Sequence, residues 1–148
     1  MPRNAPQIPY EKNMEIKFEI KGNQDDPEGN PIPKIKRTRR QYWTPEAQRY
    51  QAWKNYVQQA FIGSLTKEDL LKNFIQIEKE KPIVLNKKQK ARMDIKIYWK
   101  NEAHADAENV FGSIADALFK SDKELDGSFQ SKVSSNGKGR VEVKIKIY

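Results

Sequence analysis

The chain has 148 residues, of which 36% are hydrophobic and 32% are charged, and its formal net charge is +8. This length and apolar content fit one domain with a modest core, and the positive charge favours a polyanionic partner, most simply nucleic acid, with an acidic membrane surface as the other candidate. Because there is no cysteine and only one histidine, His104, disulfides, thiolate catalysis and Cys- or His-rich zinc sites are excluded. No apolar run is long enough to span a membrane and no signal segment begins the chain, so a cytoplasmic protein is expected.

The first predicted elements are an arm, a strand and a loop. Residues 1–13 contain three prolines and no periodicity, which predicts a flexible N-terminal arm. Apolar and charged residues alternate over 14–21, as in a strand with one buried face. The stretch 22–33 is rich in Gly, Asn, Asp and Pro, so a turn-rich loop is expected there.

A basic segment follows this loop. Five cations fall within seven residues, and two aromatic residues come directly after Gln41; these are Lys34, Lys36, Arg37, Arg39, Arg40, Tyr42 and Trp43. Lys and Arg displace counterions from a phosphate backbone, and aromatic rings stack on unpaired bases. The segment is therefore predicted to bind nucleic acid. An ordinary solvated charge run is the alternative for the cations, and a place in the core is the alternative for Trp43.

Two helical patterns come next. Thr44-Pro45-Glu46 is typical of a helix start, with a capping threonine and a proline in the first turn, and this helix is expected to end just before Gly63. Its apolar face comprises Tyr50, Trp53, Val57, Ala60 and Phe61. Thr66 begins a shorter pattern, with an apolar side formed by Leu70, Leu71, Phe74 and Ile75.

A charged connector, 78–92, leads to the next strand. Its apolar run Pro82–Leu85 is a possible short strand, and its basic end is a possible phosphate contact or a solvated loop. From Met93 to Trp99, apolar residues alternate with polar ones, which predicts a strand running toward Asp106.

Two carboxylates, Asp106 and Glu108, stand between this strand and a helical run whose apolar face is Val110, Phe111, Ile114, Ala115, Leu118 and Phe119. The simplest interpretation is that Asp106 caps the helix and Glu108 adds acid to its first turn. The alternative is a metal site. Carboxylates one residue apart can face one side while the backbone is extended, and Mg²⁺ takes one or two carboxylates plus a substrate phosphate.

The end of the chain predicts two strands. Ser128–Val133 is a possible strand, 134–139 is a turn signal, and apolar and charged residues alternate over Val141–Ile147. These two strands are expected to pair as a hairpin. The predicted fold is α+β, a single domain over 14–148 in which a small mixed β-sheet packs against two main helices.

An ordered set of motifs resembles the RusA-type Holliday junction resolvases of bacteria and their phages. The motifs are Pro31-Ile32-Pro33-Lys34 with the basic residues up to Arg40, Tyr42-Trp43-Thr44-Pro45, Asp106-Ala107-Glu108-Asn109 and Asp116-Ala117-Leu118. Asp126-Gly127 and Gly139-Arg140-Val141 are similar to the family's acidic pair and C-terminal strand. The resemblance spans most of the chain.

The resemblance implies a RusA-like nuclease domain. Such a protein would be a homodimeric, Mg²⁺-dependent endodeoxyribonuclease that resolves four-way DNA junctions by paired symmetric nicks; Mn²⁺ is a possible alternative metal. By the family motif, catalysis and metal binding would fall to Asp106, Glu108 and Asp126. Contacts to branched DNA would come from Lys34, Lys36, Arg37, Arg39, Arg40 and Asn109.

The chain departs from the family pattern at three positions. Glu108 stands for the second aspartate, Gly127 for the second member of the acidic pair, and Gly112 for a lysine three residues after the motif asparagine. Another cation would have to replace that lysine; the candidates are Lys100, Lys120 and Lys123. Two alternatives follow from these departures: a junction-binding protein of the same fold with impaired catalysis, or a basic RNA-binding module.

Overall fold

A four-stranded β-sheet in the order β1-β4-β2-β3 frames the molecule. The computed structural model describes residues 14–35, 44–77, 79–121 and 125–148. The strands are β1 (Met14–Lys21), β2 (Ala91–Trp99), β3 (Leu125–Val133) and β4 (Arg140–Ile147), and the helices are α2 (Pro45–Gly63), α3 (Lys67–Leu70) and α4 (Ala107–Leu118). The predicted α+β class and the predicted order of elements are confirmed.

Several predictions fall outside the described residues. These are the N-terminal arm at 1–13, the cations Lys36, Arg37, Arg39 and Arg40, the aromatic pair Tyr42 and Trp43, and Lys123. Lys34 is the one cation of the basic segment within the described part of the chain.

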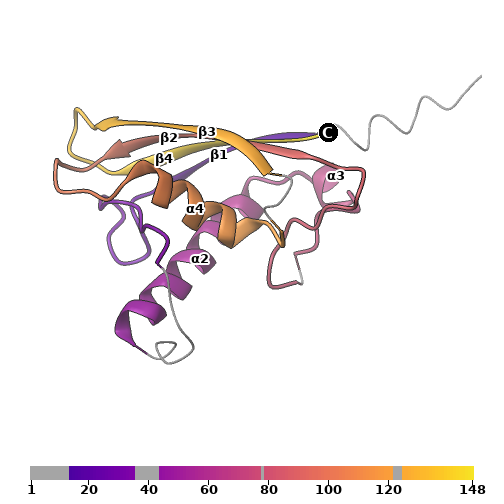
Figure 1. The fold of residues 1–148 in the computed structure, drawn as a ribbon, viewed down its shortest axis with the longest axis horizontal. Coiled ribbons are helices and arrows are strands. Elements are labelled where there is room, and N and C mark those ends of the chain that lie inside the picture. Colours follow the sequence, from indigo (N-terminus) through magenta and orange to yellow (C-terminus); the bar gives the residue numbers. More distant parts are fainter. Residues whose placement is uncertain (1–13, 36–43, 78, 122–124) are drawn as a thin grey trace, which may run out of the picture.

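The sheet has one covered face and one open face. β4 pairs antiparallel with β1 and β2, and β3 pairs parallel with β2. Because successive side chains alternate between faces, the apolar residues of β1, β2 and β4, with the exception of Tyr98, point to the side on which α2 and α4 lie (Figure 1). The charged residues point to the opposite side, which no described helix covers (Figure 1).

The expected hairpin of the last two strands is wrong. β2 lies between β3 and β4, and β3 pairs with β2 in parallel. Parallel neighbours need a crossover, which α4 provides on the covered face. The turn at 134–139 therefore spans the end of β2, where the Ser134 N–H donates to the Trp99 carbonyl at 2.7 Å.

The second predicted helix is a single turn. Thr66 and Asp69 form a capping box, but the helix ends at Leu70. Phe74 and Ile75 are buried as expected, in irregular chain, whereas Leu70 and Leu71 are exposed. Pro82–Leu85 forms no regular strand; Ile83 makes isolated bridges to Ile75 and Phe119. This irregular segment thus closes the core by burial of a few apolar side chains and not by helix packing.

Helix α2 follows its prediction closely. The Thr44 hydroxyl accepts a hydrogen bond from the Ala47 N–H at 3.2 Å, and the helix ends at Gly63. Its buried side chains are Ala47, Tyr50, Trp53, Val57 and Phe61, which pack toward the sheet and α4. Capping and helical periodicity act within a few residues, which is why the sequence predicts this element well.

Asp116, from the Asp-Ala-Leu motif, ties α4 to α2 and to the connector. Its carboxylate accepts a hydrogen bond from the Tyr50 hydroxyl at 2.9 Å and pairs with Lys54 at 3.6 Å and Lys81 at 3.4 Å. Burial favours the neutral acid, but the Tyr50 hydrogen bond and the two ammonium groups outweigh it and hold the pKa of Asp116 below its usual range. Burial and the Asp116 charge raise the pKa of Tyr50 far above its usual range.

Candidate active site

The first turn of α4 presents two free carboxylates. Asp106 occupies the N-cap position with an extended backbone, as predicted, but its side chain makes no capping hydrogen bond. Glu108 lies in the first turn, and both residues are exposed. Among the described residues, no hydrogen bond or ion pair engages either carboxylate. Their oxygens are therefore available to a cation, which is the donor set that Mg²⁺ and Mn²⁺ prefer.

The loop before Asp106 is held by stacking and hydrogen bonds. The His104 ring stacks on the buried Trp99 indole, with 4.1 Å between ring centroids and 4° between planes. The Asn30 side chain accepts from the Lys100 N–H at 2.6 Å and donates to the Ala103 carbonyl at 3.2 Å. The loop thus follows a defined path from the end of β2 to the start of α4.

The Pro-x-Pro-Lys segment docks beside the same helix. The Lys34 N–H donates to the Asn109 carbonyl at 2.8 Å. The Ser113 hydroxyl donates to the Ile32 carbonyl at 2.7 Å and accepts from the Trp53 indole N–H at 3.0 Å. These hydrogen bonds join α2, the loop and α4, and they hold the start of the basic segment against the first turns of α4.

Lys34 lies across Gly112. A Cβ on Gly112 would stand 3.3 Å from Cδ and 3.6 Å from Cβ of Lys34, so the lysine stem occupies the space that a larger residue would need. The cation nearest to the position of the missing family lysine is therefore Lys34, which the sequence analysis did not consider for this role. A glycine inside a helix costs about 1 kcal/mol relative to alanine and often marks a close approach, so Gly112 is the signal in the sequence that could have indicated this contact.

The cations proposed from sequence lie elsewhere or are engaged. Lys100 pairs with Asp26 at 3.5 Å. Lys120 follows the C-terminal end of α4, one helix length from Asp106, and Lys123 is outside the described residues. Lys34 and Asn109 are thus the predicted DNA contacts that the described structure places beside Asp106 and Glu108.

The fold of the chain does not bring Asp126 to the other two carboxylates. Asp126 lies opposite Arg92 in the β2–β3 register and forms an ion pair with it at 3.4 Å on the open face of the sheet. Gly127, the next residue, faces α4, where a Cβ would lie 3.0 Å from the Phe111 ring. Within the described ranges, no three His, Asp or Glu side chains are grouped so as to hold a metal ion.

Gly127 also excludes a side chain. A Cβ at this position would stand 1.9 Å from the Met93 carbonyl oxygen, far inside van der Waals contact. The backbone of β3 is therefore adapted to glycine where the family has its second acid. Close by, the Ser128 hydroxyl donates to Asp94 at 2.7 Å. Burial raises the pKa of Asp94, but the bonds from Ser128 and Arg92 outweigh burial and leave that pKa below its usual range.

The fold and the site together define a small basic α+β protein with free carboxylates and a lysine at one helix start, an arrangement suited to phosphodiester chemistry. Residues 26–146 match the family described as Endodeoxyribonuclease RusA, so the chain belongs to the RusA endodeoxyribonuclease family. A comparison with curated proteins gives no match. None of the described helices combines the length and the apolar composition needed to cross a bilayer.

Proposed function

We propose that the protein is a divalent-metal-dependent endonuclease that resolves four-way DNA junctions by paired symmetric nicks. The observation that carries the proposal is the pair of unengaged carboxylates, Asp106 and Glu108, beside Lys34 in a chain of the RusA family. A phosphodiester resists attack because it is anionic, so a site that hydrolyses it must bring positive charge to its oxygens.

Asp106 and Glu108 would hold the metal. When bound, Mg²⁺ or Mn²⁺ neutralises phosphate oxygens and lowers the pKa of a water. Two carboxylates suffice in one protomer, since Mg²⁺ usually keeps several waters and a substrate phosphate. Asp126 faces the other side of the sheet, so it would join this site only in an assembly of two chains.

Lys34 and Asn109 would position the substrate. The Lys34 stem is fixed over Gly112 and its backbone is bonded to Asn109, so its ammonium group is restricted to the region of the α4 start. There it would bind a phosphate oxygen and take over the role of the absent family lysine. Lys36, Arg37, Arg39 and Arg40 follow directly in the sequence and would extend the contact along the backbone.

A homodimer would supply two such sites, which suits the two-fold symmetry of a junction. β3 is an edge strand of the described sheet, and it exposes Phe129 (44%) and Val133 (37%). The Phe129 ring packs against Phe111 of α4, with 6.0 Å between centroids. An exposed edge with apolar side chains is a template for pairing with another chain, and we propose that a second copy covers it.

The test is a cleavage assay on a labelled four-way junction with Mg²⁺ or EDTA. Wild-type protein is expected to make paired symmetric nicks that need the metal. The Asp106→Asn variant should lose nicking by more than about a hundredfold, because it loses a charged ligand. It should bind the junction as well or better, because a repelling charge is gone. Asp25→Asn, another exposed aspartate, is the matched control and should nick normally.

The same assay separates the alternatives. Full nicking by Asp106→Asn would overturn the assignment of the site. Tight junction binding by the wild type without metal-dependent nicks would indicate a DNA-binding protein with lost catalysis. Single-stranded RNA that outcompetes the junction would indicate an RNA-binding module.

A further inference from the structure

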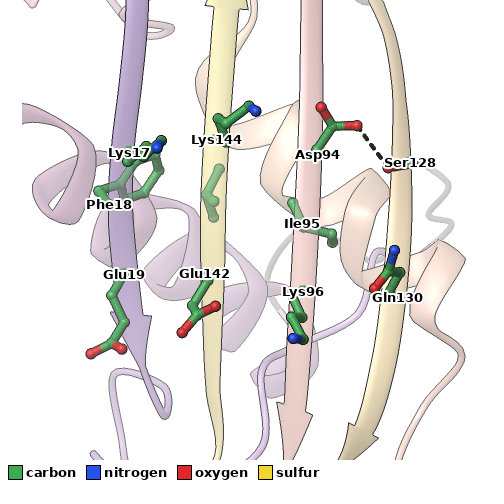
Figure 2. Close-up of a pocket in the computed structure, with 11 residues that line it drawn as sticks. Lys17, Phe18, Glu19, Asp94, Ile95, Lys96, Ser128, Gln130, Glu142 and Lys144 are labelled. Carbon is green, nitrogen blue, oxygen red and sulfur yellow. Dashed lines mark hydrogen bonds between the residues drawn. The ribbon is translucent and has the colours of Figure 1, made fainter.

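The open face of the sheet is a second charged surface, apart from the α4 site. Its side chains form rows across the four strands, because residues paired in register point to the same side. Figure 2 shows two of these rows around a groove of about 550 Å³: Lys17, Lys144, Asp94 and Ser128, then Glu19, Glu142, Lys96 and Gln130. The side chains that line the groove carry both positive and negative charges.

The positive charge gathers in the row beyond the groove. Formal charges sum to 0 for Glu15, Lys146, Arg92 and Asp126, to +1 for the Lys17 row and to −1 for the Glu19 row. The last row, Lys21, Arg140, Tyr98 and Lys132, sums to +3. This row therefore carries the net charge of the face.

Tyr98 organises these cations. The Arg140 guanidinium lies 3.7 Å from the ring centroid, and the Lys96 and Lys132 ammonium groups each lie 5.4 Å from it. Although Tyr98 points to the open face, it is only 9% exposed. A cation over an aromatic ring is held without being neutralised, so its charge remains available to a ligand.

Among the cations near Tyr98, Arg140 is neutralised by carboxylates on this face. Arg140 pairs with Glu19 at 3.5 Å and with Glu142 at 3.8 Å. Within the described chain, Lys21, Lys96 and Lys132 form no ion pair with a carboxylate, and all three are exposed. Three lysines thus present uncompensated charge around one ordered arginine.

We propose that Lys21, Lys96, Tyr98, Lys132 and Arg140, the Tyr98 platform, bind the phosphate backbone of a duplex DNA arm. Four β-strands about 4.8 Å apart give the row a width of about 14 Å. A DNA duplex of that length has about four phosphates on each of its two DNA strands. Tyr98 is the penultimate residue of β2, so the platform lies at the sheet end from which the chain runs to Asp106. One junction would contact the α4 site and the platform together. The inference rests on the proposed DNA substrate.

A polyanion fits this surface better than a second copy of the chain. The large apolar side chains that the described structure exposes are Leu70, Leu71, Ile77, Phe129, Val133 and Tyr148, and none belongs to the platform. Interfaces between protein chains have apolar cores from which lysine is depleted. Surfaces that bind nucleic acid are instead rich in Lys and Arg.

The experiment compares two double variants with equal loss of charge. Lys21→Ala with Lys132→Ala removes two cations of the platform, and Lys17→Ala with Lys144→Ala removes two from the same face outside it. Binding to a four-way junction and to a plain duplex is measured from 50 to 300 mM salt. The platform variant should bind about tenfold or more weakly near 0.1 M salt, with a salt slope smaller by about 2. The control variant should stay within about threefold of the wild type with its slope unchanged.

Three results would overturn the proposal: wild-type binding by the platform variant, equal losses in both variants, or loss of the dimer by the platform variant in sedimentation. Tyr98→Leu should weaken binding while Tyr98→Phe retains it, and equal effects of these two changes would also contradict the platform. Failure here is distinct from failure of the proposed function. Asp106-dependent nicking with an unaffected platform variant refutes only the platform, and duplex binding can be measured whether or not nicking occurs.

Discussion

Replacement of Asp116 tests whether the Asp-Ala-Leu motif serves the fold or the chemistry. In Asp116→Ala, the Tyr50 hydroxyl and the ammonium groups of Lys54 and Lys81 all lose their carboxylate partner. The lysine side chains are only 14% and 18% exposed, so water replaces the lost contact poorly. We therefore expect the variant to fold with the start of α4 intact but with lower stability.

The magnitude follows from the contacts. A hydrogen bond to a charged group contributes about 1.5–3 kcal/mol, and leaving a partly buried charge without its partner adds to the loss. Asp116→Ala should therefore lower the free energy of unfolding by about 2–4 kcal/mol. Asp116→Asn keeps an acceptor for Tyr50 and should lose about half as much. With a slope of about 2 kcal/mol per molar urea, the Ala variant should shift the midpoint by about 1–2 M.

The pH dependence has a definite sign. The pKa of Asp116 is lower in the folded state than its ordinary value of 3.8. The stability that the Asp116 carboxylate contributes is therefore complete above pH 3.8 and is lost as the pH falls through the lower pKa of the folded state. The difference in free energy of unfolding between the wild type and Asp116→Asn should be constant from about pH 7 to 5 and should become smaller below pH 3.8.

Urea unfolding followed by tryptophan fluorescence at several pH values measures both effects. Asp25→Asn is the control, because the Asp25–Arg49 pair at 3.1 Å is exposed and should contribute at most about 1 kcal/mol. An Asp116→Ala variant as stable as this control would refute the reasoning. So would a gap between the wild type and Asp116→Asn that does not change between pH 7 and 3.

Three further predictions concern the site, the dimer and the sheet. Lys34→Ala should reduce junction nicking by about a hundredfold, whereas Lys100→Ala, which removes an ion-paired lysine, should not; equal rates in the two variants would contradict the role of Lys34. Phe129→Glu should yield monomers in sedimentation equilibrium if β3 is the dimer edge, and an unchanged mass would point to another surface. Gly127→Ala places a Cβ 1.9 Å from a carbonyl of β2 and should cost at least about 2 kcal/mol in thermal or urea unfolding, whereas Gly63→Ala, with no atom within 4 Å, should not destabilise the protein.

Local patterns in the sequence were sufficient to predict most of the helices and strands. The alternation in β1, β2 and β4, the cap at Thr44 and the stop at Gly63 depend on residues within one or two turns of each other, so each could be read along the chain. The apolar pattern after Thr66 predicted burial of Phe74 and Ile75 correctly, but it did not show that the helix ends after one turn.

The arrangement of the site was decided only by tertiary structure. The sequence by itself determined which residues carry charge, which are apolar and which motifs occur, and the family follows from these. Strand order and register determined that β2 separates β3 from β4 and that Asp126 lies with Arg92 on the open face of the sheet, opposite α4. Docking of the loop determined that Lys34 lies over Gly112. Both results depend on packing between residues far apart in the chain, and periodicity within a segment cannot report which distant segment becomes its neighbour.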